Sequence, residues 1–431
     1  MIKKVLIVSE LFQPLNSIGS IRPSKLAKYL SQAGMNVTVF TSHKTRTNNQ
    51  HLSVDFKVIY DCDVSSTMSM DTPIESKVKH SPVFKEMVLF PFKKELSMTY
   101  RQYLTYKESF SFYKAFLSHV SRGDIDLSEY DSIFTTFGPI GPVLIGMKAK
   151  KLNPKIKWIN DFRDPMVSQM MPILVKPLYK YIQRKSVESC DWVTTVSQGY
   201  KDRIQTSKSI NKCKVIPNGF DIDDKPQIPI NSQQSKLFDF TYVGALYEGK
   251  RDISPLFKAL RKMVDEKILF IEDVVFNYAG KDVKYLIQQA SKYNMEMIVR
   301  DYGFLSRNEC LNLQSTSRFL VLSTWNEKGE EGVFPGKFIE YMLMEKPIVS
   351  IVDGSLAGAE VSQTIRKYNL GVSYEKADKS TEYELYEWLK AQAVCFKDRS
   401  PAIFNADKQK ILKTYDWKYI IERFCKLIND G

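Results

Sequence analysis

The sequence has few of the residues that mark metalloproteins, disulfide-rich secreted proteins and membrane-spanning proteins. Among its 431 residues are only four histidines and six cysteines. The cysteines form no C-x-x-C pair and the histidines no zinc-type cluster, so no redox motif and no metal site is predicted. Because no signal peptide follows Met1, we expect reduced thiols and a cytoplasmic protein. The apolar run at residues 5–8 is far too short to span a bilayer.

Acidic residues are also in short supply. The chain has 49 Asp and Glu against 62 Lys and Arg, which gives a net charge of +13. Such a charge indicates an acidic partner, namely nucleic acid, anionic lipid or a phosphorylated substrate, unless it is only an ordinary basic surface. What is abundant is apolar sequence, at 43% of the residues, which is enough to build buried cores. At roughly 100–200 residues per domain, the length predicts two or three domains.

The first half of the chain alternates strand-like apolar runs with helical periodicity. A buried strand is predicted at residues 5–8, followed by a loop at 12–22 and a helix that begins at Pro23, a favoured early helix position. Gly34 is expected to end this helix. Further strands are predicted at residues 37–40, 132–136, 157–160, 192–196 and 214–216. This order is typical of an open, parallel, doubly wound α/β lobe.

A polar, proline-containing stretch at residues 221–236 predicts a linker between two lobes. A second α/β series follows it, with strands predicted at residues 240–243, 274–278, 319–322 and 348–352. The two halves share no close sequence repeat, but their alternation of strands and helices is alike. The last predicted element is an amphipathic helix at residues 417–428.

One block interrupts the α/β alternation. Residues 76–122 contain nine Lys and Arg against three Glu, interleaved with aromatic and aliphatic residues. This pattern suits an element that lies on an anionic membrane surface. It suits equally a helical pair packed on the first lobe with a solvated basic face.

The strongest chemical motif lies at residues 331–342, after the strand predicted at 319–322. Gly336 falls near a predicted helix N-terminus, where unpaired N–H groups and the helix dipole attract an anion. Lys337 adds a full positive charge there. Glu340, one turn further on, is placed to accept hydrogen bonds from a ribose diol. The alternative is a structural Gly-Lys turn that merely opens a helix.

A second motif occupies residues 244–252, directly after the strand predicted at 240–243. Ligands of open α/β sheets bind at this carboxyl end of the strands. Gly244 would let a ligand approach the backbone, and Lys250 and Arg251 could pair with phosphate oxygens. The alternative is an ordinary basic turn.

Two loops of the first lobe carry the remaining candidates. One contains Gly138, and the other contains Asp161, Arg163 and Asp164 after a predicted strand. Three charges at a strand end are too many for simple burial unless they are paired. A structural Arg–Asp pair is an equally good interpretation of Asp161.

Taken together, these segments resemble the retaining glycosyltransferases of family 4. The resemblance rests on an "IPNG-hydrophobic-D" stretch at residues 216–221, on Val196-Ser197, and on Asp416-Trp417 before the last helix. It is strongest for bacterial cell-surface polysaccharide members with "DFRDPW" and "PGKLFEYL" segments, which correspond here to residues 161–166 and 335–342. It covers nearly the whole chain except residues 44–125.

The chain departs from the family pattern in three places. Many members have two glutamates seven residues apart; Glu340 matches the second, but Gly332 occupies the first position, one residue after Glu331. Ala245 stands where many members have arginine. The usual His-Asp of the first lobe is replaced by Arg163-Asp164.

The resemblance implies an α/β protein with the GT-B fold, in which two doubly wound Rossmann-like lobes face a cleft. Residues 1–220 would bind the acceptor, residues 237–415 would bind a nucleotide sugar, and a helix at residues 416–431 would return to the first lobe. The implied activity is that of a hexosyltransferase that transfers a sugar, with retention, from a nucleoside diphosphate sugar to a glycan or lipid-linked saccharide. Cell-surface polysaccharide such as capsule is the implied product, made at the inner face of the membrane.

The resemblance and the motifs together define the candidate site. The expected catalytic residues are Lys250, Arg251, Arg163 and Asp164. The expected donor-binding residues are Gly244, Gly336, Lys337, Glu340 and Glu331, and the expected acceptor residues are Gly19, Arg22 and Gly138. No D-x-D segment is obvious at a strand end, so neither a metal nor a cofactor is expected. A GT-B-fold nucleotide-sugar epimerase and a non-catalytic nucleotide-sugar-binding relative are the alternatives, and no nucleic-acid motif is present.

Overall fold

The computed structural model describes residues 2–15, 17–45, 56–62, 90–169, 171–226 and 236–430, with only the backbone of residues 18 and 90–94. Contacts divide the chain into two compact units. The first lobe consists of residues 1–195, 204–214 and 424–431, and the second lobe of residues 196–203 and 215–423. Most of the predicted linker, residues 227–235, lies outside the described residues.

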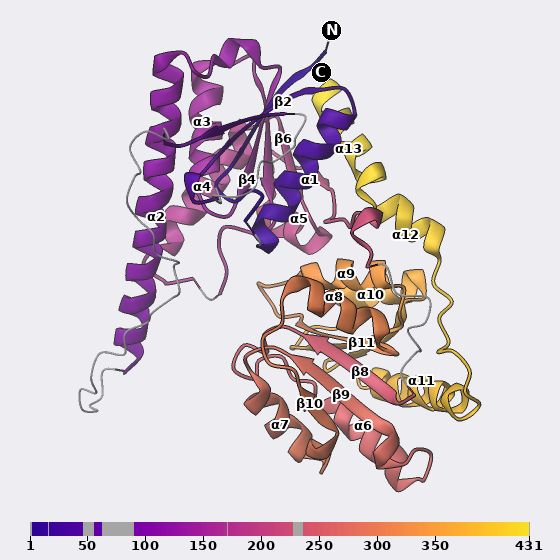
Figure 1. Cartoon of the computed structure of the whole chain (residues 1–431). Helices are drawn as coiled ribbons and strands as arrows, with labels where there is room; N and C mark the ends of the chain where they lie inside the picture. Colours follow the sequence, from indigo (N-terminus) through magenta and orange to yellow (C-terminus); the bar gives the residue numbers. More distant parts are fainter. Residues whose placement is uncertain are drawn as a thin grey trace. The chain divides into compact units, whose positions relative to one another are not determined.

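The first lobe is built on a seven-stranded sheet with the order β3-β2-β1-β4-β5-β6-β7 (Figure 1). Its strands are β1 (Lys4–Ser9), β2 (Asn36–Thr41), β3 (Lys57–Tyr60), β4 (Ser132–Phe137), β5 (Lys157–Phe162), β6 (Trp192–Thr195) and β7 (Cys213–Val215). The pairs from β3 through to β6 are all parallel. Residues 5–8 of β1 are fully buried because helices cover both faces of the sheet. The predicted doubly wound α/β lobe is therefore confirmed.

The helices of this lobe are α1 (Ile18–Gln32), α2 (Phe90–Arg122), α3 (Gly141–Leu152) and α4 (Lys176–Ser189), and α5 (Gln198–Ile204) follows β6. The predicted start of the first helix was wrong. It begins at Ile18 rather than Pro23, because the side chain of Ser17 caps it by accepting a hydrogen bond from the Ser20 N–H at 3.2 Å. Pro23 lies inside the helix.

The basic and aromatic block forms a single helix over its described part. Residues 76–89 lie outside the described residues, and α2 runs for 33 residues from Phe90. Its inner face packs Phe112 and Phe116 against Phe40 of β2, at ring centroid distances of 4.9 and 5.2 Å. One continuous helix packed on the first lobe therefore occupies residues 90–122, and the predicted helical pair is not tested because residues 76–89 lie outside the described part of the chain.

The second lobe contains a six-stranded sheet with the order β10-β9-β8-β11-β12-β13, all parallel. The strands are β8 (Phe238–Val243), β9 (Val274–Ala279), β10 (Val299–Asp301), β11 (Phe319–Trp325), β12 (Ile348–Asp353) and β13 (Gly371–Glu375). Numbered within each lobe, the second sheet has the strand order 3-2-1-4-5-6, and the first sheet has the same order with a seventh strand added at its end. In this order the chain reverses direction across the sheet between the first and fourth strands, and ligands bind outside the carboxyl ends at that switch point.

Both faces of the second sheet are buried, as its apolar strand runs predict. Side chains alternate along β11, so Phe319 and Val321 belong to one core, whereas Leu320 and Leu322 belong to the other. The first core is closed by α6 (Ser254–Asp265), α7 (Val283–Ser291) and α11 (Ser380–Lys397). The second is closed by α9 (Gly336–Met344), α10 (Glu360–Tyr368) and α12 (Lys408–Tyr415).

Two further helices complete the described chain: α8 (Arg307–Thr316) and the terminal α13 (Trp417–Asn429). The end of α13 belongs to the first lobe, where the Phe424 ring lies 5.7 Å from that of Phe134 on β4. Lys157 on β5 donates to the backbone carbonyls of Ile428 and Asp430 at 2.8 and 2.6 Å. No helix in the described part of the chain has the length and apolar character needed to cross a bilayer.

Candidate functional site

The switch point of the second lobe lies between β8 and β11. Strand β8 ends at Val243, and Gly244 follows with a φ of +118°, a conformation that favours glycine. Helix α9 begins at Gly336, as predicted, with Pro335 as its N-cap residue. Proline has no side-chain acceptor, so it leaves the first N–H groups of the helix available to an anion.

Lys337, in the first turn of α9, reaches across to the end of β8. Its Nζ donates to the carbonyl oxygen of Val243 at 2.8 Å and lies 4.1 Å from the centroid of the Tyr242 ring. A Cβ atom at Gly244 would lie only 3.0 Å from this Nζ. Gly244 therefore provides the room in which the ammonium group of Lys337 lies.

Arg251 approaches the same point from the turn after β8. Its Nη1 donates to the Tyr242 hydroxyl at 3.1 Å and to the Ala245 carbonyl at 3.0 Å. The guanidinium carbon lies 4.6 Å from the centroid of the Tyr247 ring and 5.7 Å from that of the Trp325 ring. Such cation–π contacts hold the cation in place while leaving N–H groups available for further hydrogen bonds.

The electrostatics of this cluster favour the arrival of negative charge. Burial, together with the nearby Arg251, holds the pKa of Lys337 well below its usual range, although Glu340 partly opposes this. Burial also raises the pKa of the Tyr242 hydroxyl to about 12, so this group stays neutral. None of the ion pairs in the described part of the chain involves Lys337 or Arg251. A buried arginine and a half-buried lysine therefore lie together with little compensation, beside a helix N-terminus.

Other predicted donor residues are placed differently. Glu340 accepts from Arg307, the first residue of α8, at 2.7 Å, and both side chains are partly exposed. Glu331 turns back to accept from the Gly329 N–H at 2.9 Å, which lowers its pKa. Lys250 is exposed on the turn, in contrast to the buried Arg251. The structure thus brings together Gly244, Arg251 and Lys337, with Glu340 one turn along α9.

Four residues of this site were missed by sequence reasoning: Tyr242, Tyr247, Trp325 and Arg307. Tyr242 was counted only as part of a strand, although its position one residue before the strand end would place it beside the loops. Trp325 falls outside the strand predicted at residues 319–322, but it is the last residue of β11. Arg307 had no signal beyond its place in the first turn of a helix, because its pairing with Glu340 joins residues 33 positions apart.

At the switch point of the first lobe, the guanidinium group of Arg163 lies against two other predicted residues, Gly19 and Gly138. Arg163 donates to the carbonyl oxygens of Phe137 and Gly138, with a distance of 3.0 Å from Nη2 to the Gly138 oxygen. Cβ atoms at Gly19 and Gly138 would lie 2.9 and 2.6 Å from its terminal nitrogens. Both glycines therefore make room for Arg163, and Asp164 next to it is exposed.

Arg22, which is predicted among the acceptor residues, lies instead in a buried ion pair. It is 2% exposed and bonds Asp161, which is 0% exposed, through Nε at 3.0 Å and Nη2 at 2.8 Å. Thr136 and Thr194 also donate to the Asp161 carboxylate. A charge this deeply buried persists only when it is paired, so Arg22 and Asp161 form the structural pair that was the alternative interpretation of Asp161.

Glu10, directly after β1, is a titratable residue that sequence reasoning missed. Its Oε1 accepts from the Gly141 N–H at the start of α3 at 3.1 Å. Burial raises its pKa to about 7, and the nearby Asp61 and Glu108 add to that shift, whereas bonds to Ser109 and Gly141 oppose it. Glu10 therefore changes charge near neutral pH at the switch point of the first lobe.

A cavity of about 170 Å³ lies elsewhere in the second lobe, near the ends of β12 and β13. Its charged side chains satisfy one another: Lys376 pairs with Asp353 at 2.8 Å, and Lys258 pairs with Glu382 at 2.5 Å. The charges that line this cavity are therefore compensated, unlike those of the Arg251–Lys337 cluster. As for metals, one group within the described residues has ligand-type side chains close together, namely His43, Asp61 and Cys62.

No protein-family model matches the chain, and no curated protein sequence matches it. Solved structures do match it over nearly its whole length. A sucrose-phosphate synthase from Thermosynechococcus elongatus is 12% identical, with a TM-score of 0.62 over 99% of this chain and 98% of that one. WaaG, a glycosyltransferase involved in lipopolysaccharide biosynthesis, is 12% identical, with a TM-score of 0.56 over 99% of this chain and 100% of that one. An E. coli trehalose-6-phosphate structure bound with UDP-2-fluoro glucose is 10% identical, with a TM-score of 0.60 over the whole of both chains.

These neighbours are GT-B glycosyltransferases, and at such low identity the likeness shows the fold alone. The chain therefore has the GT-B fold, with two parallel Rossmann-like sheets and their flanking helices. The predicted fold class is confirmed. Membership of family 4 and a retaining outcome stay predictions, since no sequence match supports them.

Proposed function

We propose that this protein is a glycosyltransferase that uses a nucleoside diphosphate sugar as its donor. The observation that carries the proposal is the Arg251–Lys337 cluster at the β8–β11 switch point. Two cations that lack a carboxylate partner among the described residues, and that border a helix N-terminus, form a site for a compact dianion. The structural neighbours include one bound with UDP-2-fluoro glucose, which supports this class of donor.

The chemistry follows from the charge that develops during transfer. The bond between the sugar C1 and the diphosphate oxygen breaks, and negative charge collects on that oxygen. Lys337, Arg251 and the α9 N-terminus would stabilise this charge without a metal ion, and such preorganised groups are worth roughly 100- to 1,000-fold in rate each. An acceptor hydroxyl then forms the new bond to C1 and releases its proton. We propose retention of configuration from the resemblance described above.

The remaining predicted residues are given supporting roles in this proposal. Glu340, oriented by Arg307, would accept hydrogen bonds from the donor's ribose, with Gly336 and Glu331 beside it and Lys250 at the outer edge. In the first lobe, Arg163 and Asp164 would contact the acceptor, and Gly19 and Gly138 would keep the Arg163 guanidinium in place. We propose a glycan or lipid-linked saccharide as the acceptor, a hexose as the transferred sugar, and bacterial cell-surface polysaccharide such as capsule as the product. We propose no cofactor.

The first test is a thermal-shift screen of the full chain against UDP-, GDP-, ADP- and dTDP-linked sugars. A ligand that binds the folded state raises the melting temperature through mass action. CMP-linked sugar is the matched control, because it has one phosphate fewer and should produce a smaller shift. If no nucleoside diphosphate or its sugar raises the melting temperature of the folded protein, the proposed donor site is wrong.

The second test separates the proposal from its alternatives. NMR of the bound nucleotide sugar with candidate acceptors should show loss of the donor, appearance of free nucleoside diphosphate and a new glycosidic signal. A stereoisomer of the nucleotide sugar, formed without acceptor, would indicate an epimerase. Binding without any product across acceptors and without slow donor hydrolysis would favour a non-catalytic relative.

We also propose that the first lobe docks on an anionic membrane surface at the cytoplasmic face. The outer face of α2 is unusual for a helix packed on a globular lobe, since its exposed stripe mixes apolar and aromatic side chains with lysines. The stripe repeats at helical spacing, opposite the buried Phe112 and Phe116, and consists of Leu96, Tyr100, Tyr103, Lys107, Phe110 and Lys114. Apolar rings that alternate with lysines suit a headgroup region.

A neighbouring segment continues this surface. Leu174, Leu178 and Tyr181 at the start of α4 are exposed. This segment is joined to α2 by a hydrogen bond from the Gln102 amide to the Tyr179 hydroxyl at 2.7 Å. The two helices therefore present apolar side chains from adjacent parts of one lobe.

Flotation with vesicles that contain phosphatidylserine or phosphatidylglycerol tests the membrane proposal. The chain should float with anionic vesicles at low salt and separate from them as salt rises. Lys107→Glu with Lys114→Glu should abolish flotation, whereas the same charge change at Lys284 and Lys292 in the second lobe should preserve most of it. Equal flotation of both double variants would overturn the assignment to α2.

A further inference from the structure

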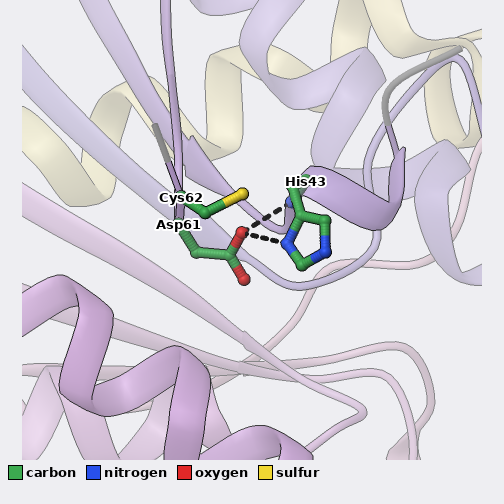
Figure 2. Close-up of side chains that lie close together, drawn as sticks. All are labelled: His43, Asp61 and Cys62. Carbon is green, nitrogen blue, oxygen red and sulfur yellow. Dashed lines mark hydrogen bonds and ion pairs between the residues drawn. The ribbon is translucent and has the colours of Figure 1, made fainter. Parts of the chain in front are cut away.

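Three side chains of metal-ligating type converge at the carboxyl ends of two neighbouring strands of the first lobe. His43 lies two residues after the end of β2, and Asp61 and Cys62 directly follow β3. Their ligand atoms all lie within 4.8 Å of one another. Figure 2 shows the Cys62 sulfur and the Asp61 carboxylate on the same side as the His43 ring.

The backbone holds these residues in place. Strands β2 and β3 pair in parallel, with Thr41 opposite Tyr60, and the Asp61 N–H donates to the Thr41 carbonyl at 3.0 Å. The His43 N–H donates to Oδ1 of Asp61 at 2.7 Å, and the His43 ring bonds the same oxygen through Nδ1 at 2.6 Å (Figure 2). The backbone bond orients the carboxylate independently of the imidazole, as outer-sphere hydrogen bonds do for ligands of bound metals.

We propose that His43, Asp61 and Cys62 bind a zinc ion. A nitrogen, a sulfur and a carboxylate oxygen together favour a borderline-soft divalent ion over Mg²⁺ or Ca²⁺, which prefer sites made of oxygen ligands alone. Tetrahedral zinc with bonds of about 2.0–2.3 Å places its ligand atoms roughly 3.3–3.8 Å apart, which lies within the spread of this cluster. Three protein ligands leave the fourth position to water.

Binding requires only a small change in the cluster. The Nδ1–Oδ1 distance of 2.6 Å is shorter than two zinc ligands allow, so the ion replaces this hydrogen bond, and the imidazole and carboxylate separate by about 1 Å. The His43 side chain is 46% exposed and has room to move outward, whereas Asp61, at 12%, stays fixed by the backbone bond. The thiol of Cys62 loses its proton on binding, because the thiolate is the ligand.

A zinc ion at this position would link the edge strand β3 to the loop that follows β2. β3 is a four-residue edge strand with no fully buried side chain, and it is joined to the lobe through β2. An ion held by His43 on one side and by Asp61 and Cys62 on the other links two positions 18 residues apart. Zinc therefore stabilises the attachment of β3, and this role does not depend on the proposed transferase activity.

Titration of the metal-free full chain with Co²⁺ tests the proposal. Cobalt replaces zinc at such sites and gives a charge-transfer band when a thiolate binds it. We expect one equivalent to bind with that band, and excess Zn²⁺ to remove it. Cys62→Ser should eliminate the band, and His43→Ala should weaken binding by at least about tenfold, as the loss of a supporting ligand interaction does. Cys310→Ser, a partly buried cysteine of the second lobe, is the matched control and should bind like the wild type.

Two further measurements keep the test decisive. Asp61→Asn keeps an acceptor for the His43 N–H and so preserves the loop, yet it should weaken cobalt binding. Zn²⁺ should raise the melting temperature of the wild type but not that of Cys62→Ser, while both bind nucleotide sugar equally. A cobalt band that survives in Cys62→Ser, or binding as strong in the Cys62, His43 and Asp61 variants as in the wild type, would show that the metal binds elsewhere and would overturn the proposal. Absence of any binding at micromolar concentrations would overturn it as well.

Discussion

At the switch point of the first lobe a buried arginine is paired with a buried carboxylate, whereas at the switch point of the second lobe two cations lie together without an ion-pair partner among the described residues. In the first lobe, Asp161 holds Arg22 in a buried ion pair. In the second lobe, Arg251 and Lys337 are held by carbonyl oxygens and aromatic rings. The same strand order therefore supports two different arrangements of charge, one neutralised within the fold and one left without a carboxylate partner, as the proposed donor site requires.

The difference lies in what holds each cation. A carboxylate neutralises Arg22, so little attraction remains for an outside anion. Carbonyls and the Tyr242 ring orient Lys337 without cancelling its charge, and burial then lowers its pKa. Orientation without neutralisation is the condition that an anion site needs before its ligand arrives.

The largest expected effect follows from removing the carboxylate of the buried Arg22–Asp161 pair in the first lobe. Asp161→Ala leaves the Arg22 guanidinium buried without its partner, so the free energy of unfolding should fall by about 3–5 kcal/mol. Urea denaturation of the full chain measures this loss. The matched change Glu340→Ala removes a partly exposed carboxylate from Arg307 and should cost no more than about 1 kcal/mol. Equal losses for the two variants would mean that the two lobes do not differ in this respect.

The next largest effect concerns Lys337 in the second lobe, which has no carboxylate partner among the described residues. Lys337→Met should reduce sugar transfer by about 100- to 1,000-fold, because it removes a preorganised cation from the leaving diphosphate. Stability should not fall, since the folded state holds this lysine at a lowered pKa and methionine carries no charge to bury. Initial rates with the donor found by thermal shift measure the first outcome. Lys284→Met, which removes an exposed lysine of α7 in the same lobe, is the control and should change the rate by less than about threefold.

A third prediction uses the titration of Glu10 in the first lobe. The folded-state pKa is raised from 4.5 to about 7, so between these values the folded protein binds more protons than the unfolded chain. The contribution of Glu10 to stability is therefore greatest at low pH and falls as the pH rises through this window. Relative to the wild type, Glu10→Gln should gain stability between pH 5 and pH 8, which denaturation at both pH values would show. A difference that does not change with pH would contradict the prediction.

The smallest expected effect tests how Arg251 is held. Tyr247→Ala removes one of the two rings that flank the guanidinium, and an exposed cation–π contact contributes about 0.5–1 kcal/mol. Donor affinity should therefore fall by roughly twofold to fivefold in a calorimetric titration. Tyr302→Ala, at another exposed tyrosine of the same lobe, is the control and should bind the donor unchanged.

Much of the fold was predictable because its strands are short apolar runs that keep both faces buried. The predicted strand ends were wrong where pairing with a neighbouring strand extends a strand beyond its apolar run. Residues 323–325 look like a polar loop, yet they belong to β11 because β12 pairs with them through Ile351, Val352 and Asp353. The hydroxyls of residues 323 and 324 are buried in the paired strand. The free-energy cost of burying these hydroxyls is not part of the local sequence preference.

The site was predictable to the level of loops but not of side-chain direction. Gly244, Lys337 and Arg251 meet because parallel strands end at one edge of the sheet. The choice between Lys250 and Arg251 depends on a tight turn in which Tyr247 and Glu248 take left-handed φ values of 51° and 56°. Nothing in the sequence indicates that two non-glycine residues adopt this conformation, so the inward direction of Arg251 could not be read from it.

The return of the last residues to the first lobe has a consequence for synthesis on the ribosome. Lys157 bonds the carbonyl of Ile428, 271 residues later, and the Arg22 guanidinium lies 5.4 Å from the Phe424 ring. At about 5–20 residues per second, translation separates these partners by tens of seconds. The lobe that emerges first is thus completed last, and until then the side of β4 beneath Phe424 stays uncovered for chaperones to bind.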